Sequence, residues 1–437
     1  MKTDEGLIRA VGVRGLTAAI INYTIGAGIF VLPAVVAGKV GAAAPVIYIV
    51  CAIAMGLVVL CFADAGSRVS LSGGTYAYAE TAFGPFAGFI VAITLWLGSA
   101  VLACAAVANV SADAFATLFP VLATPWVRGT FIALMFAGLA AINIRGVRIG
   151  SGVVQTFTVA KLTPLLILAI AGMFAINWNN LAWPGMPTGS EIARTTVLLI
   201  FAFTGVESAL TPSGEVKNPA RTVPRSILIA LVSVTILYMI LQVVAQGILG
   251  AELATNTKAP LAEAARRSIG DIGQKLVLIG MAISTFGYVA GDMLASPRSI
   301  YALGRDNLIP SVVGSVHEKY RTPHVAIVVH AIACAGFAIS GSFASLAVLA
   351  VLSVLIVYLV CCLATIQLRR KNVRTEGALP FSVPGGPIIP LLAVAMLIWL
   401  MSSSTKQEFI AIGAMLAAEV VLYFIMRLRR VPVPVVS

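Results

Sequence analysis

Long apolar runs separated by short polar stretches divide this chain into segments of similar length. A helix needs about 20 apolar residues to cross a bilayer, and no backbone amide can stay unpaired in lipid, so each run is expected to be a helix. The run at 84–117 is longer than one crossing needs, which indicates strong tilt or extension beyond the bilayer. The pattern predicts twelve spans, at 15–38, 43–64, 84–117, 127–144, 151–176, 192–213, 224–250, 272–302, 324–341, 344–368, 386–403 and 408–426.

The composition agrees with a chain whose main solvent is lipid. Only 11% of the 437 residues are charged, while 59% are hydrophobic. An ordinary soluble domain carries roughly 25% charge. So few charges cannot cover soluble domains with a wetted surface, which excludes a cytoplasmic enzyme, a secreted disulfide scaffold and a disordered regulator. The expected fold class is therefore an all-α membrane protein, with residues 1–437 forming a single integral membrane domain.

The net charge of +12 is distributed unevenly along the predicted topology. An even number of spans places both termini on one side, and that side holds 20 of the 29 Lys and Arg residues, against 8 on the other. Because basic loops stay in the cytoplasm, both termini are expected there, in a protein of the plasma (inner) membrane. The basic excess thus indicates topology, and nucleic acid is not an expected partner.

The cysteines and histidines give no motif for chemistry. All six cysteines lie inside apolar runs without metal-ligand spacing, so we expect small buried residues and no disulfides. The three histidines are too widely spread for a metal site or a catalytic triad. The sequence also lacks a phosphate-binding loop of the Walker type. We therefore expect no catalytic residue, no metal and no cofactor.

Two of the predicted spans contain residues that interrupt a helix. The first span carries Gly26 and Gly28, and the sixth carries Gly205, Glu207 and Pro212. Glycines alone more often mark close packing. Two interruptions five helices apart, however, are expected of two five-helix halves related by an inverted repeat. Broken helices free backbone amides at one end and carbonyls at another, and together these groups can bind a zwitterion at membrane depth.

Four stretches of the chain carry a resemblance to a known family. They lie in the first span, after the second, through the sixth and after the eighth. On these stretches the chain resembles the amino acid–polyamine–organocation (APC) superfamily of transporters, over nearly its whole length. The stretches are IGAGIF, SGGTYAYAETAFG, FTGVESALTPSGEVKNPARTVPRS and GRDNLIP.

The resemblance implies a fold and an activity. The implied fold is the LeuT-type 5+5 inverted repeat, with discontinuous helices 1 and 6. The first repeat would cover about 15–176, the second about 192–368, and two extra helices about 386–426. The implied activity is secondary transport of amino acids or related amines by alternating access.

The resemblance also implies a substrate site at the two breaks. The substrate carboxylate would meet amides after the first break, and the ammonium would meet carbonyls in the sixth span. Phe201 or Phe203 would be an aromatic lid, with core packing as the alternative for each. Some relatives with cationic substrates have a Trp in place of Phe201. The implied binding residues are Thr24, Ile25, Gly26, Ala27, Gly28 and Ile29 in the first span and Phe201, Ala202, Phe203, Thr204 and Gly205 in the sixth.

Three charged residues within the spans are candidates for coupling or support, because an intramembrane charge is expensive. Lys161 interrupts the apolar fifth span and could exchange protons or only brace the helices. In some similar transporters a lysine here occupies a sodium site, bonding first-span carbonyls and an eighth-span hydroxyl, here Ser284 or Thr285. We therefore expect transport to be independent of Na⁺. Glu207 is expected to organise the unwound segment, and Asp292 to pair with an unidentified polar group.

A further pair of charged residues lies at the cytoplasmic end of the second span, where Asp64 and Arg68 are one helical turn apart.

The leading prediction for the whole chain is a proton symporter or exchanger of small or neutral L-amino acids. The alternative is an exchanger of cationic amino acids or polyamines, which would need a pocket carboxylate, either Glu207 or Asp292. A membrane-embedded enzyme or a channel is a distant alternative. Expected partners are the amino acid, the lipid bilayer and, for symport, protons, whereas the oligomeric state is not predicted.

Overall fold

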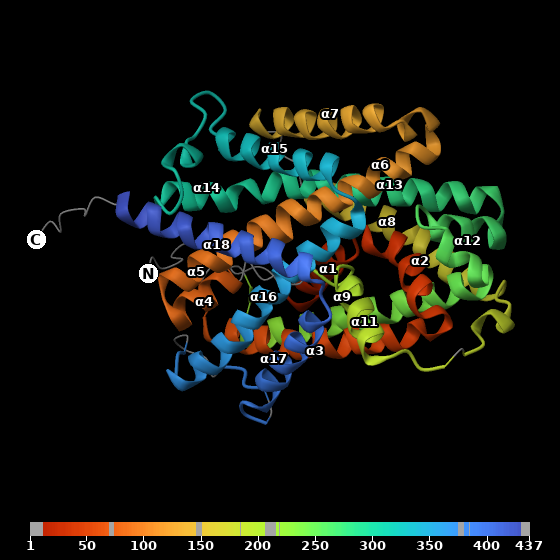
Figure 1. Cartoon of the computed structure of the whole chain (residues 1–437), viewed down its shortest axis with the longest axis horizontal. Coiled ribbons are helices and arrows are strands. Elements are labelled where there is room, and N and C mark those ends of the chain that lie inside the picture. Colours follow the sequence, from red (N-terminus) through yellow and green to blue (C-terminus); the bar gives the residue numbers. More distant parts are fainter. Residues whose placement is uncertain are drawn as a thin grey trace, which may run out of the picture.

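The protein is a bundle of helices, which Figure 1 shows along its length. The computed structural model describes residues 12–69, 74–145, 151–183, 185–205, 216–217, 219–374, 380–383 and 385–429, and these contain no strand. The helices are α1 (Val13–Thr24), α2 (Gly28–Val40), α3 (Ala44–Arg68), α4 (Thr75–Phe83), α5 (Pro85–Thr94), α6 (Ala103–Leu118), α7 (Pro125–Ile144), α8 (Ser151–Met173), α9 (Gly189–Ile200), α11 (Pro219–Leu249), α12 (Pro260–Ile269), α13 (Asp271–Ala295), α14 (Pro297–Arg305), α15 (His324–Ser340), α16 (Phe343–Arg370), α17 (Ile388–Ser402) and α18 (Lys406–Arg429).

Seven segments of the described chain are long and apolar enough to cross a membrane. Three shorter apolar helices accompany them, Lys161–Met173, His324–Ser340 and Ile388–Ser402. One of the seven, Gly28–Arg68, contains α2 and α3, which the short 3-10 helix Gly41–Ala43 separates. The prediction of an all-helical membrane protein is thus confirmed. The count of twelve spans stays a prediction.

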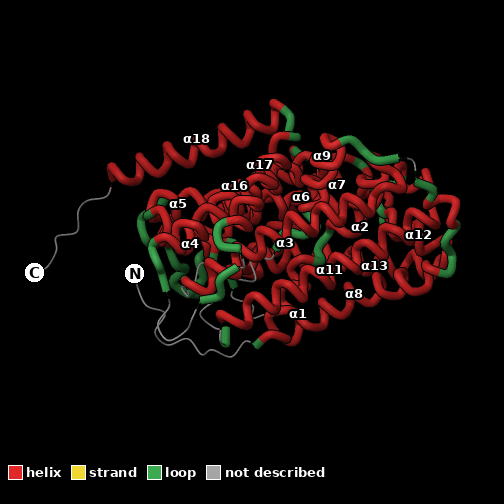
Figure 2. Tube along the Cα trace, turned by 90° about the horizontal axis from the view of Figure 1, so that it is seen from below, coloured by secondary structure: helices red, strands yellow, loops and turns green. Residues whose placement is uncertain are grey.

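The outer surface of the bundle is apolar. Leu134 in α7, Ile332 in α15 and Ile410 in α18 are 60–67% exposed, although they belong to three different helices. Exposed apolar surface of this extent is rare in soluble monomers and matches the hydrocarbon interior of a bilayer. Figure 2 shows α18 along one outer edge of the bundle. The exposed faces are therefore suited to lipid contact.

The centre of the bundle is built around α1, α2, α9 and α11. Helix α11 packs along α3 and α1, while α2 packs against α9. In Figure 1 these helices lie between α7 at one edge and α17 at the other. Buried polar contacts fix this arrangement. The Tyr48 hydroxyl donates to Gln242 Oε1 (3.1 Å), and Gln242 Nε2 donates to the carbonyl of Pro33 (3.3 Å), which joins α3, α11 and α2.

The long apolar run at 84–117 folds differently from a single regular helix. It contains α5, a π-helix at Leu95–Leu102 and α6 in direct succession. A π-helix is rare and frequently occurs at functional sites. Hydrophobic periodicity does not reveal it, because all of its residues belong to one uninterrupted apolar run.

Candidate functional site

The first predicted span is interrupted where its glycines predicted. Helix α1 ends at Thr24 and α2 begins at Gly28. Ile25 leaves the helical conformation (φ −79°, ψ 84°), and the amide of Gly26 donates to Thr24 O (2.9 Å) instead of continuing the helical pattern. The intervening residues 25–27 therefore form a short non-helical link between two helices.

The start of α2 presents backbone amides without partners. Within the described part of the chain, no hydrogen bond is made by the N–H groups of Ala27, Gly28 and Ile29, whereas that of Phe30 donates to Ala27 O (3.1 Å). Ala27 and Ile29 are each only 1% exposed. Buried amides need an acceptor, and a helix N-terminus favours a negative charge. This end of α2 is thus suited to bind a carboxylate.

The second interruption follows α9, which ends at Ile200. The amides of Phe201, Ala202 and Phe203 each donate three residues back, to Leu198, Leu199 and Ile200, so the backbone tightens out of the α-helical pattern. Gly205 then adopts φ +113°, a conformation that other residues rarely reach. The helix thus ends inside the predicted sixth span and is followed by a tight turn over residues 201–205, while residues 206–215 lie outside the described part of the chain.

Two of the carbonyls expected to meet an ammonium group already accept a hydrogen bond. Phe201 O accepts from Thr204 Oγ1 (2.8 Å), and Ala202 O shares the single proton of the Tyr238 hydroxyl (3.1 Å) with Thr24 O. A carbonyl oxygen has two lone pairs, so each retains room for a second donor. The segment thus offers partly satisfied acceptors rather than free ones.

The two interruptions lie directly against each other. A Cβ added at Gly28 would lie 2.9 Å from the Cα of Ala202, and one added at Gly205 would lie 2.9 Å from Tyr23 O. Tyr238 of α11 joins them, since its hydroxyl lies 3.1 Å from both Thr24 O and Ala202 O. Tyr238 could not be predicted from the sequence, because one tyrosine in a long apolar run gives no signal of what it contacts.

The family resemblance implies a substrate site here, and on that basis we expect Gly28→Ala to weaken substrate binding by roughly 10-fold or more. The new methyl group would meet backbone atoms of Ala202, which cannot rotate away, and overpacking typically costs about 1–3 kcal/mol. Uptake and ligand-induced thermal shifts of the purified variant measure the effect. Gly138→Ala in α7 is the matched control, because its Cβ would meet nothing within 4 Å. Equal losses in both variants would contradict the close approach.

The two phenylalanines of the second break have different surroundings. Phe203 is 1% exposed and packs edge-on against Tyr238, with ring centroids 5.4 Å apart. Phe201 is 7% exposed and packs edge-on against Phe343 at 5.5 Å. The surroundings of Phe203 match the core-packing alternative. Of the two residues, Phe201 therefore remains the candidate for the aromatic lid.

Lys161 of α8 is buried and reaches the first break. Its Nζ donates to Asn22 O (2.6 Å) and Ile25 O (2.7 Å). In a continuous helix these carbonyls would accept from Gly26 and Ile29, whose amides do not bond to them. The lysine ammonium thus replaces two helical hydrogen bonds that the break removes.

The expected contact between Lys161 and an eighth-span hydroxyl is not formed. Thr285 Oγ1 donates to Met281 O (2.8 Å) in its own helix, and the hydrogen bonds of Lys161 Nζ go to Asn22 O and Ile25 O instead. Ser284 Oγ is buried and makes no hydrogen bond with the described residues. Glu207, the other predicted charge near the second break, lies outside the described residues.

Asp292 has a partner that sequence analysis missed. His330 of α15 is fully buried, and its Nε2 lies 2.8 Å from Asp292 Oδ2. The indole N–H of Trp96, in the π-helix, donates to His330 Nδ1 (3.1 Å). The position of His330 inside an apolar run was the one sign in the sequence that it has a buried polar partner. The distance of 38 residues between the partners concealed the pairing.

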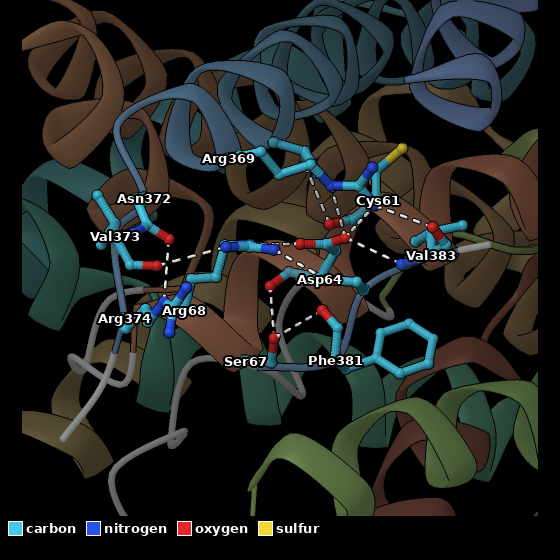
Figure 3. Close-up of polar contacts among 12 residues, drawn as sticks. Cys61, Asp64, Ser67, Arg68, Arg369, Asn372, Val373, Arg374, Phe381 and Val383 are labelled. Carbon is cyan, nitrogen blue, oxygen red and sulfur yellow. Dashed lines mark hydrogen bonds and ion pairs between the residues drawn. The ribbon is translucent and has the colours of Figure 1, made fainter. Parts of the chain in front are cut away.

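A separate ion-pair cluster joins the ends of α3 and α16. Asp64 is fully buried and accepts from Arg68 Nε (2.6 Å), Arg369 Nε (2.9 Å) and the amide of Val383 (3.1 Å). Figure 3 shows both guanidinium groups converging on this carboxylate. The predicted Asp64–Arg68 pair is confirmed, and Arg369 is an addition. A cavity of about 480 Å³ adjoins this cluster and is lined by Arg68, Arg369 and Ser382, not by the break residues.

The chain is similar to known proteins over nearly its whole length. The family whose description is amino acid permease matches residues 11–426. A methylthioribose transporter of Bacillus subtilis (strain 168) is 26% identical, over 97% of this chain and 94% of the relative. The serine/threonine exchanger SteT and the branched-chain amino acid permease BcaP, of the same organism, are similar to the chain. They are 27% and 26% identical, over 94% and 97% of this chain and 94% of each relative.

Proposed function

This chain belongs to the amino acid permease family and is a membrane transporter of amino acids rather than an enzyme, and we propose that it carries small or neutral L-amino acids by alternating access. The APC resemblance read from its motifs is confirmed by the family match. The observation that carries the substrate proposal is a group of three buried amides, those of Ala27, Gly28 and Ile29, which have no partner among the described residues and lie next to the carbonyls of 201–205.

The proposed binding mode uses the backbone for both charged ends of the substrate. The carboxylate accepts from the amides at the start of α2, and the ammonium donates to carbonyls of Phe201, Ala202 or Thr204. This arrangement needs no buried arginine or aspartate for recognition. SteT and BcaP are named for neutral amino acids, serine and threonine in one case and branched-chain residues in the other. Both names support a neutral substrate here.

The proposed architecture is the twelve-span LeuT-type fold. In this proposal α1 with α2 forms the first span, and α9 begins the sixth. The first repeat runs from α1 to α8, the second from α9 to α16, and α17 and α18 are the extra helices. The occurrence of helix breaks in the first and sixth spans supports the inverted relation. Both termini are proposed to lie in the cytoplasm of the cell whose plasma membrane holds the protein.

The proposed energy source is a proton gradient or exchange, without Na⁺. Sodium-coupled proteins of this fold use first-span carbonyls as ligands for the ion. Here Asn22 O and Ile25 O already accept from the Lys161 ammonium. A sodium ion in the same place would meet a fixed positive charge. Transport is therefore proposed to be unaffected by replacing Na⁺ with K⁺.

Exchange of cationic amino acids or polyamines is the second candidate function. It needs a carboxylate free to meet the distal cation. Of the two carboxylates that the sequence suggested, Asp292 is already paired with His330, and Glu207 lies outside the described residues. The pairing of Asp292 favours the neutral substrate.

A thermal-shift screen of the purified protein tests the proposal. Serine, alanine, leucine, arginine and methylthioribose are compared, since a ligand that binds the folded state raises the melting temperature. We expect shifts with one or more neutral amino acids, and saturable counterflow of that amino acid in liposomes. Binding of arginine without alanine, serine or leucine would replace the proposal with the cationic alternative. Flux without saturation would indicate a channel.

A further inference from the structure

A group of potential metal ligands gathers where α6, α13 and α15 pack together. One ligand atom each from Cys104, Asp292 and Cys334 lies within 4.8 Å of the other two. Both cysteines are fully buried, and the aspartate side chain is 9% exposed. We propose that these three residues bind a soft divalent cation of the Zn²⁺ or Cd²⁺ class, at a site separate from the substrate site.

The chemistry of the three ligands selects the cation. Two thiolates and one carboxylate suit Zn²⁺, which takes sulfur, nitrogen and oxygen ligands in a tetrahedral arrangement. Bond lengths of about 2.3 Å to sulfur and about 2.0–2.2 Å to oxygen place ligand atoms roughly 3.5–3.8 Å from one another in a tetrahedral arrangement. The three ligand atoms already lie within 4.8 Å of one another, so small side-chain rotations bring them to these distances. Mg²⁺ and Ca²⁺ bind oxygen ligands, so this set excludes them.

His330 holds the carboxylate in place rather than binding the cation. The Trp96 indole N–H can only donate, so His330 Nδ1 must accept and the ring proton lies on Nε2. That Nε2–H therefore donates to Asp292 Oδ2, at 2.8 Å. Metal-binding carboxylates commonly have such a supporting hydrogen bond. His330 is thus a positioning residue, which Trp96 fixes in one tautomer.

The local electrostatics fit occupancy by a cation. A metal ion binds cysteine as the thiolate. A divalent cation replaces the two thiol protons, which are released to solvent as binding proceeds. The bound group, with two thiolates, one carboxylate and the 2+ ion, carries a net charge of −1, next to the donating imidazole.

The site also has a structural setting and a route of entry. The π-helix Leu95–Leu102 carries Trp96 and continues directly into α6, which carries the ligand Cys104. Asp292 is the least buried of the three ligands, so we place the entry on its side. A bound cation would tie three helices together. We therefore expect it to stabilise the protein and slow transport.

Titration of the reduced, chelator-treated protein with Cd²⁺ is the direct test, because cadmium–thiolate bonds give an ultraviolet charge-transfer band. We expect this band, together with a rise in melting temperature on adding Zn²⁺. Cys334→Ser and Asp292→Asn should each weaken binding by at least about 10-fold. Removing a residue that only supports a ligand already lowers metal affinity by about 10-fold or more, and a lost ligand should cost at least as much. Retained thermal shifts with the transported amino acid show that each variant is folded.

Two controls separate this site from other thiols and from a general packing effect. Cys61 and Cys362 are also in contact, so Cys362→Ser must leave the band unchanged. His330→Ala should weaken Cd²⁺ binding about 10–100-fold while the band persists at saturation, and His330→Gln, whose amide can donate to Asp292, should restore much of the affinity. The proposal is overturned by absence of the band, by a band that survives Cys334→Ser, or by a Cys104–Cys334 disulfide in place of the free thiols.

Discussion

Liposomes containing Lys161→Ala are expected to take up substrate at about a tenth of the wild-type rate or less. The substitution leaves Asn22 O and Ile25 O without the donor that replaces their helical partners. Loss of one hydrogen bond from a charged group costs about 1.5–3 kcal/mol, and two are lost here. Each 1.4 kcal/mol changes an equilibrium constant by a factor of ten. Destabilising the conformation of the first break by this free energy therefore gives the stated reduction in rate. Initial rates of labelled amino acid uptake measure it.

The pH dependence of the residual uptake distinguishes two roles for the lysine. If Lys161 carries the coupled proton, the variant loses the pH dependence of the wild type. If the lysine only braces the break, the rate falls and the shape of the pH profile is retained, which would exclude the proton-carrier role. Lys275→Ala is the matched control, since that lysine lies exposed on α13. Wild-type uptake by Lys161→Ala would contradict both roles.

The second large effect concerns stability. Asp64→Asn is expected to lower the free energy of unfolding by about 3–5 kcal/mol, because it removes the negative partner of two largely buried arginines, Arg68 and Arg369. The cluster joins α3 to α16 and to the segment 380–383 (Figure 3). Unfolding of the purified protein, followed by heat or denaturant, measures the loss.

An exposed ion pair provides the comparison for this variant. Asp306 lies 3.0 Å from Arg305, and both side chains are more than half exposed. Exposed pairs contribute about 0–1 kcal/mol, so Asp306→Asn should change stability little. If both substitutions had the same small effect, the buried cluster would not be a principal source of stability. Transport by Asp64→Asn at reduced temperature would show that the loss is one of stability.

Much of the helical layout and the position of the breaks could be predicted from sequence. The apolar runs predicted helices, and Gly26, Gly28 and Gly205 predicted the interruptions, because glycine lowers the cost of leaving a helix. The link between Lys161 and the first span followed from the family resemblance. These features are local, or they depend on motifs whose surroundings are already known.

The contacts between distant helices could not be predicted in this way. Arg369 lies 305 residues after Asp64, and His330 lies 234 residues after Trp96. Their pairing depends on how each helix is rotated about its axis, and a nearly uniform apolar helix gives no periodic signal of that rotation. The same reason conceals the meeting of Cys104, Asp292 and Cys334. The sequence predicted no metal site because their spacing along the chain matches no ligand motif.

The position of Tyr238 has a consequence for movement between the two broken helices. A phenol has a single proton, while Thr24 O and Ala202 O compete for it at equal distances of 3.1 Å. A small turn about the C–O bond transfers the donated bond from one acceptor to the other, and the ring stays packed against Phe203. The Tyr238 hydroxyl can therefore keep one hydrogen bond when either Thr24 O or Ala202 O moves away from it. A movement of one segment relative to the other then does not require both hydrogen bonds to be broken at the same time.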